Sequence, residues 1–373
     1  MSRSCMGETG NYLLGEDFRF TSTQTFKFTL PGRVEGSPVK VLTSFAAKAT
    51  GSAASLLTFK CNGTQLESST TDRIAAVSSS DNYTHCKLTN TVKTPDFDGE
   101  NLEWTITFTN SGTVLNMARL DYITVNYERS LTATGTDFPF RYIGNTDVVL
   151  RLANATANTV VIDVTDTGNP QIAAEGSSGS TEVLLTPASS GPREYRAYSG
   201  ESLPSPTLAG TVATQNLHGA STSDLIIISP TEFTTQAQRI ASLHESMDSM
   251  RVTVIDPEKI YNEFSSGTPD IMAFRKMAKM FYDRGTDTEG HHLQHVLLFG
   301  RASYDNRRIS QSAQGNRYPI LPMWETQVGD YDNTSYGTDD FIAVLNDGSS
   351  ENTLSDARFS TFCIGVGRMP VKS

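Results

Sequence analysis

The sequence predicts a multidomain β plus α/β protein, in which an antiparallel β-sandwich of jelly-roll type precedes a parallel-sheet, Rossmann-like region. Apolar and polar residues alternate in the first part, as in Leu102-Glu-Trp-Thr-Ile-Thr-Phe108, which indicates strands with one buried face. Residues 223–301 instead alternate short apolar runs with amphipathic helical segments, as parallel strands buried on both faces do. We therefore expect a sandwich domain at 1–135, a β-rich second domain or linker at 136–220, and an α/β subdomain at 221–373.

The β regions are predicted from short strand candidates separated by turns rich in Gly, Ser, Asn and Asp. In the first region the candidates are residues 25–30, 39–45, 56–60, 83–88, 102–108 and 122–127. The pattern continues at 147–152 and 159–164, and residues 182–185 and 193–198 indicate one more hairpin. A second small domain and an extension of the first both fit this pattern.

Three parallel strands are predicted in the α/β region, at residues 224–229, 251–256 and 295–300. The helix after the first strand has one apolar stripe, formed by Ile240, Leu243, Met247 and Met250. Residues 339–345 and 362–366 fit further strands. Because ligands of open parallel sheets gather at the carboxyl ends of the strands, we expect the functional edge at 229–232, 256–258 and 300–305.

The second helix is predicted over residues 269–284. Thr268 is its expected N-cap, Pro269 suits the first helical position, and Gly285 suits the position after its end. Its apolar stripe consists of Ile271, Phe274, Met277 and Phe281.

Composition excludes several classes of function. The net charge of −11 and the pI near 5.1 argue against a nucleic-acid-binding surface, which needs clustered Lys and Arg. No apolar run approaches the roughly 20 residues of a membrane-spanning helix, and the first residues have no apolar core of a signal peptide. Both ends are abrupt, so we expect the sequence to be a fragment of a longer protein.

The cysteines indicate no disulfide framework, because four of them without a Cys-x-x-Cys spacing are too few. Cys61 and Cys86 lie in strand-like runs, and a disulfide between them is one possibility. Cys363 lies in an apolar run and is expected to be a small buried hydrophobe rather than a nucleophile.

The candidate metal ligands are acidic. Asp305, Asp339 and Asp340, together with Asp332, can gather oxygen ligands for calcium, although they lack an EF-hand spacing, and solvated turns are the alternative. The run His291-His-Leu-Gln-His295 contains zinc-ligand residue types, but its place between a helix and a strand favours a loop. No phosphate-binding loop and no Gly-x-Ser-x-Gly motif is present, so no cofactor is predicted and a flavodoxin-like nucleotide binder is disfavoured.

Several motifs, in this order and spacing, resemble the gingipain-type cysteine peptidases of family C25, and within it the branch of type IX secretion sortases. They are Asn216-Leu-His-Gly219 before the first parallel strand, Tyr261-Asn-Glu-Phe-Ser-Ser-Gly267, Asp270-Ile-Met-Ala-Phe-Arg275, Val296-Leu-Leu-Phe-Gly300 with Ser303-Tyr-Asp305, Thr338-Asp-Asp340, and Ile364-Gly-Val-Gly-Arg-Met-Pro-Val371. Each motif is weak alone, and their combination is fairly specific. Residues 118–123 and 127–131 also look like the β region that precedes the peptidase domain in that branch.

The resemblance implies a caspase-like peptidase unit whose catalytic His and Cys follow the Gly-Arg-Met-Pro segment, beyond Ser373. No catalytic residue is therefore assigned, and this chain by itself is expected to be inactive. The whole protein would be a sortase and signal peptidase that removes C-terminal sorting domains from secreted cargo at the outer cell surface of a Gram-negative bacterium. Its partners would be that cargo and other secretion-system components. The alternative is a non-catalytic surface-binding or scaffolding protein with a peptidase-like half domain.

Overall fold

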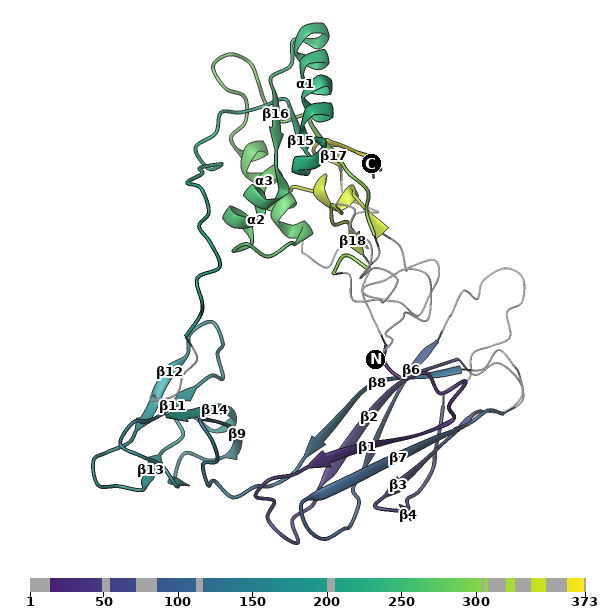
Figure 1. Cartoon of the computed structure of the whole chain (residues 1–373), viewed down its shortest axis with the longest axis vertical. Helices are drawn as coiled ribbons and strands as arrows, with labels where there is room; N and C mark the ends of the chain where they lie inside the picture. The colour runs from purple at the N-terminus through teal and green to yellow at the C-terminus, as the bar shows by residue number, and fades with distance from the viewer. Residues whose placement is uncertain are drawn as a thin grey trace.

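A computed structural model describes residues 14–48, 54–71, 86–111, 117–199, 205–303, 305–307, 320–325, 337–346 and 361–371. Two β units and an α/β unit follow one another along the chain (Figure 1). Within the described ranges, no helix is both long and apolar enough to cross a membrane.

The first unit is an antiparallel β-sandwich, as the alternating pattern predicts. Its strands are β1 (Thr23–Thr29), β2 (Lys40–Lys48), β3 (Leu56–Cys61), β4 (Thr64–Gln65), β5 (Ser69–Thr70), β6 (Lys87–Lys93), β7 (Asn101–Thr109) and β8 (Met117–Asn126). One sheet has the order β1-β7-β3-β4, with β5 beside β3, and the other has the order β6-β2-β8. Phe45, Phe59 and Trp104 are fully buried in the core of this unit, because every second residue of their strands points inward.

Two details of the sandwich differ from the prediction. The strand expected at 83–88 begins at Lys87, and residues 83–85 lie outside the described residues. Cys61 packs in the sandwich core, whereas Cys86 packs with Leu14 and Ala46, and no disulfide joins the two cysteines.

The second β unit encloses a hydrophobic cluster of its own. Its strands are β9 (Asp137–Gly144), β10 (Leu150–Ala153), β11 (Thr159–Asp163), β12 (Gln171–Glu175), β13 (Glu182–Leu185) and β14 (Gly191–Ser199). Phe138, Val161 and Tyr195 are buried in that cluster. The predicted hairpin of 182–185 with 193–198 is wrong, because β13 pairs with β10 while β14 lies between β11 and β9.

The α/β unit has a four-stranded, all-parallel sheet, which confirms the predicted parallel architecture. The strands are β15 (Leu225–Ile228), β16 (Val252–Ile255), β17 (His295–Phe299) and β20 (Gly365–Met369), in the order β16-β15-β17-β20. The helices are α1 (Thr234–Asp248), α2 (Pro257–Phe264) and α3 (Ile271–Asp283), with short 3₁₀ turns η2 (Thr231–Phe233) and η4 (Asp340–Ile342) and a small hairpin of β18 (Trp324–Glu325) and β19 (Gly337–Thr338).

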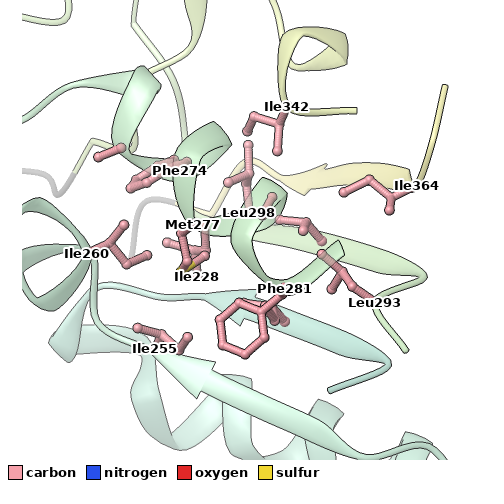
Figure 2. Close-up of a cluster of buried hydrophobic side chains, with 14 of the residues drawn as sticks. Ile228, Ile255, Ile260, Phe274, Met277, Phe281, Leu293, Leu298, Ile342 and Ile364 are labelled. Atoms are coloured by element: carbon pink, nitrogen blue, oxygen red, sulfur yellow. The ribbon is translucent and has the colours of Figure 1, made fainter. Parts of the chain in front are cut away.

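Side-chain alternation along β15 divides the core into two layers. Ile226 and Ile228 face a cluster with α2, α3 and η4, which includes Phe274, Met277 and Phe281 (Figure 2). Leu225 and Ile227 face the opposite layer, where α1 packs. All four β15 side chains are buried, so the apolar run Leu225–Ile228 is explained by two covered faces.

Helix α1 is present, and its predicted apolar stripe is confirmed only in part. Ile240 and Met250 pack against the cluster on this side of the sheet, as predicted. Leu243 is 52% and Met247 74% exposed, so these two residues are not part of the core. Ala237 and Ala241, which the prediction omitted, are the fully buried residues of α1.

Other elements also depart from the prediction. Asp256 accepts a hydrogen bond from the Glu258 N–H (2.8 Å) and starts helix α2, which the prediction omitted. The N-cap of α3 is Asp270, which accepts from the Met272 N–H (2.9 Å), rather than Thr268. Residues 339–345 form a buried 3₁₀ turn and coil instead of a strand.

Candidate functional site

The carboxyl ends of β15, β16 and β17 meet at one edge of the sheet, where a pocket of about 430 Å³ opens. This is the edge at which the sequence predicts ligand binding. The segment after β15 contributes Thr231 and Glu232, the start of α2 contributes Asp256, Glu258 and Tyr261, and the loop after β17 contributes Asn306.

Asp256 holds two walls of the pocket together. One carboxylate oxygen caps α2, and the other accepts a hydrogen bond from the Thr231 hydroxyl. The two hydrogen bonds of Asp256 therefore hold the segment after β15 against the first turn of α2.

The pocket is acidic. Glu232, Asp256 and Glu258 line it, and none of the described residues that line it is Lys or Arg. Tyr261 is only 3% exposed and its ring stacks on Phe274 with centroids 5.5 Å apart. Burial, and then the neighbouring carboxylates, raise the pKa of Tyr261, so its hydroxyl stays a neutral donor. The pocket is therefore suited to a cationic or hydrogen-bonding group.

The side chain of Arg368 on β20 joins several segments of the chain at this edge of the sheet. Its guanidinium donates to the carbonyls of Gly300 (3.0 Å), Leu321 (3.1 Å) and Pro322 (3.1 Å) and forms two hydrogen bonds to Asp339 (2.7 and 2.8 Å). Its side chain is 11% exposed, so these bonds act largely shielded from water. One arginine thus joins β20, the end of β17 and two loop segments.

Gly300 directly follows β17 and lies close to the side chain of Leu321. A Cβ atom at this position would lie 3.1 Å from the Leu321 side chain and 3.7 Å from Pro230. The close approach explains why glycine follows the strand here, without any phosphate-cradling role.

Two buried acids lie beside the pocket. Asp305 is 4% and Glu325 6% exposed. Burial, and then the charge of Asp305, raise the pKa of Glu325 to about 7. Among the described residues, Glu325 Oε2 and the Oδ1 atom of Asn306 have no hydrogen-bond partner. Asn306 also donates to the Met323 carbonyl (3.1 Å), so its oxygen is held in place.

The three aspartates predicted as calcium ligands lie in different surroundings. Asp305 lies beside Glu325, Asp339 is paired with Arg368, and Asp340 is exposed at the start of η4, where the Thr338 hydroxyl accepts from its N–H (3.1 Å). Asp332 lies outside the described residues. In the described part of the chain no three His, Cys, Asp or Glu side chains gather around one point, and calcium binding stays a prediction.

The histidine cluster lies at the opposite, amino-terminal edge of the sheet. Asp224 precedes β15 and contacts His291 Nδ1 (2.5 Å) while it accepts from the N–H groups of Arg251 (2.8 Å) and His292 (3.1 Å). Although burial raises the pKa of Asp224, these hydrogen bonds lower it overall. His291 therefore has a carboxylate partner that orders the loop before β17.

His218 docks the segment before β15 onto α2. Its ring stacks on Phe264 (centroids 4.7 Å apart) and its Nδ1 lies 2.7 Å from Glu263. Burial raises the pKa of Glu263, but hydrogen bonds from the Leu217 N–H, Gln215 and His218 outweigh it and lower the pKa to about 2. The contact is structural and lies outside the pocket.

Cys363 is half-buried and packs against the main core, with its thiol 3.3 Å from Asn346 Oδ1 and 3.9 Å from the Thr361 carbonyl. These neighbours include no imidazole that would activate the thiol.

Comparison with known proteins identifies the α/β region. Residues 218–373 match the model of peptidase family C25. The whole chain is similar to the crystal structure of dimeric latent PorU from Porphyromonas gingivalis, with 26% identity and a TM-score of 0.82 over 100% of this chain.

This chain covers 36% of that PorU chain, so it spans about a third of its length. The structure of Paenibacillus xanthan lyase matches 47% of this chain and 22% of its own chain, at 10% identity and a TM-score of 0.17, and that likeness carries no argument. No curated protein matches the chain. The match to PorU shows that the two β units and the C25 region together form a PorU-like, caspase-like architecture.

The sequence predicted the edge of the sheet at which the pocket opens, but not all of the residues around it. The sequence contains an indication of the role of Arg368, because it is the one charged residue of the short strand Gly365–Met369. A buried arginine in a strand requires hydrogen-bond acceptors around it. The sequence contains no such indication for Asn306 and Glu325, since only the fold brings residues 19 positions apart into contact.

Proposed function

We propose that this chain is the N-terminal portion of a gingipain-like C25 cysteine endopeptidase that acts as a type IX secretion sortase. The observation that supports this most is the similarity to PorU along the entire chain, β units included. The family model matches residues 218–373, whereas the similarity to PorU extends over the preceding β units as well.

The proposed activity is removal of C-terminal sorting domains from secreted cargo at the outer cell surface. The acidic pocket at the carboxyl edge of the sheet supplies one wall of the substrate-binding face, and the β units contact cargo or other secretion-system components. This chain covers 36% of the PorU chain, so activity is measured on the full-length protein.

The test uses the full-length protein that contains this chain, incubated with a purified cargo protein bearing a C-terminal sorting domain. Intact-mass spectrometry is expected to show release of that domain, and alkylation of the full-length protein with iodoacetamide is expected to abolish the release. Stable binding of cargo without any cleavage would instead support the scaffolding function.

The proposed location is tested on intact cells. Biotinylation with a membrane-impermeant reagent is expected to label the full-length protein, as it labels other proteins on the outer face. Labelling only after cell lysis contradicts a cell-surface location.

A further inference from the structure

The junction of the two β units forms a groove of about 680 Å³. Residues 125–129, at the end of β8 and just after it, form one side, and residues 141–143 of β9 form the other, with Lys40 and Leu150 completing the lining. We name this feature the junction groove. The two strands border the space between the sandwich and the second β unit (Figure 1).

Both bordering strands are outer strands of their sheets. Within the described residues, β9 pairs only with β14, whereas β8 pairs with β2 on one side and its first half is bridged to Asp17 at Arg119 on the other. Side chains of successive strand residues point to opposite faces, so a pocket lined by three consecutive residues of β9 is lined by the edge of the strand. The groove therefore meets a row of backbone N–H and C=O groups that the sheet itself does not pair.

The β9 edge carries Pro139 and Arg141, which are residue types that protect edge strands, and also an exposed apolar residue. Ile143 is 75% exposed at this edge, and neighbouring Val149 is 61% exposed. Pro139 removes one N–H from the first half of β9, which leaves the half at Arg141–Ile143 as the pairing edge. An exposed apolar residue on an unpaired strand is typical of a surface that another strand covers.

The lining of the junction groove has a net positive charge, whereas the whole chain has a net negative charge. Lys40, Arg129 and Arg141 line it against the single acid Glu128, although the net charge of the chain is −11. The Arg129 guanidinium lies over the Phe138 ring, 4.0 Å from its centroid, and its buried Nε has no hydrogen-bond partner among the described residues. The ring holds the guanidinium in place at the groove, where its positive charge attracts a carboxylate.

We propose that the junction groove binds an extended polypeptide segment that alternates apolar and acidic residues and adds as a strand to the edge of β9. The backbone of the segment pairs with residues 141–143, its apolar side chains cover Ile143 and Leu150, and its carboxylates face Arg129 and Lys40. The inference does not depend on peptidase activity, because every residue it uses lies in the two β units.

The test measures binding of a fluorescent ten-residue peptide, alternating isoleucine or valine with aspartate, to the full chain by fluorescence anisotropy. Ile143→Lys and Arg129→Gln are each expected to weaken binding at least about tenfold. The matched control is Ile172→Lys, which alters an equally exposed isoleucine (66%) on β12, the opposite outer strand of the same sheet, and is expected to bind like the unaltered chain.

Two further peptides separate strand addition from simple attraction. A peptide with N-methylated backbone amides is expected not to bind, because it cannot pair with β9. A peptide with lysine in place of aspartate is expected to bind at least about tenfold more weakly. Equal or tighter binding of the lysine peptide overturns the proposal, since an acidic chain attracts it without any specific groove.

Hydrogen exchange of the unaltered chain gives a readout that needs no variant. The amides of Arg141–Ile143 are expected to become protected when the acidic peptide is added, while those of β12 stay unchanged. Absence of this protection, or binding that Ile143→Lys leaves intact, overturns the proposal. Dimerisation of the chain that Ile143→Lys abolishes also overturns it, by assigning the edge to a second copy.

Discussion

At the scale of single residues, the ionisation of Glu325 makes the stability of the folded protein depend on pH. Its pKa is raised to about 7 from an ordinary value of 4.5, so the folded protein holds a proton that the unfolded chain loses first. Stability from this group is fully present below pH 4.5 and is lost as the pH rises through 7, by up to about 3 kcal/mol.

Glu325→Gln tests this effect, because glutamine keeps the shape and does not ionise. Urea unfolding of the variant is expected to show a flatter fall in stability between pH 5 and 8 than the unaltered chain. Glu289→Gln, at a side chain that is 70% exposed, is the control and is expected to leave the profile unchanged. An unchanged profile in the Glu325 variant contradicts the buried, protonated carboxyl.

Asp305, Asn306 and Glu325 are also where a hard cation fits best, since two oxygens there lack partners. If calcium binds, millimolar CaCl₂ is expected to raise the Tm of the chain, and Glu325→Gln is expected to reduce that rise. Glu289→Gln, at an exposed acid outside the predicted ligands, is the control. A rise in Tm that persists in the Glu325 variant places the ion elsewhere.

Arg368 is the residue whose loss is expected to disturb the site most. Arg368→Ala leaves Asp339 without its cation and three carbonyls without their donor, at a cost of about 3 kcal/mol in the free energy of unfolding. Arg141→Ala, which breaks an exposed pair with Glu194, is expected to cost less than about 1 kcal/mol. Equal costs measured by chemical denaturation would contradict this role of Arg368.

At the scale of elements, two residues, Thr268 and Asp270, are candidates for the N-cap of helix α3. The sequence favours Thr268, whereas in the structure the Asp270 carboxylate accepts from the Met272 N–H. Asp270→Ala is expected to cost about 1 kcal/mol, and Thr268→Ala only a few tenths, by urea unfolding. The reverse order would restore the sequence-based interpretation.

The elements also show which features of the fold the local sequence pattern could predict. The run Leu225–Ile228 was predictable, because a strand covered on both faces has no polar positions. The buried face of α1 was predictable only in part, since Ile240 packs against the core as expected, whereas the buried residues Ala237 and Ala241 are too small to mark an apolar stripe. Residues 341–345 are as apolar as a strand, yet Arg275 binds the Val344 carbonyl (2.8 and 3.0 Å) and holds them beside α3 as a turn.

At the scale of the whole molecule, the order of the β and α/β regions could be predicted from composition and period alone. The edge at which the pocket opens also followed from topology, because parallel strands align their carboxyl ends. The side chains that surround the pocket could not be predicted as a group, since Glu232, Glu258 and Asn306 come from three separate connections.

The central claim is that this chain supplies the substrate-facing carboxyl edge of a C25 peptidase sheet. It is tested most directly by kcat/KM of the full-length protein on cargo with Glu232→Gln and Glu258→Gln at the pocket, against Glu289→Gln at the opposite edge. We predict a loss of at least about fivefold for the pocket variants and no change for the control. Pocket variants that cleave as fast as the control would contradict the account.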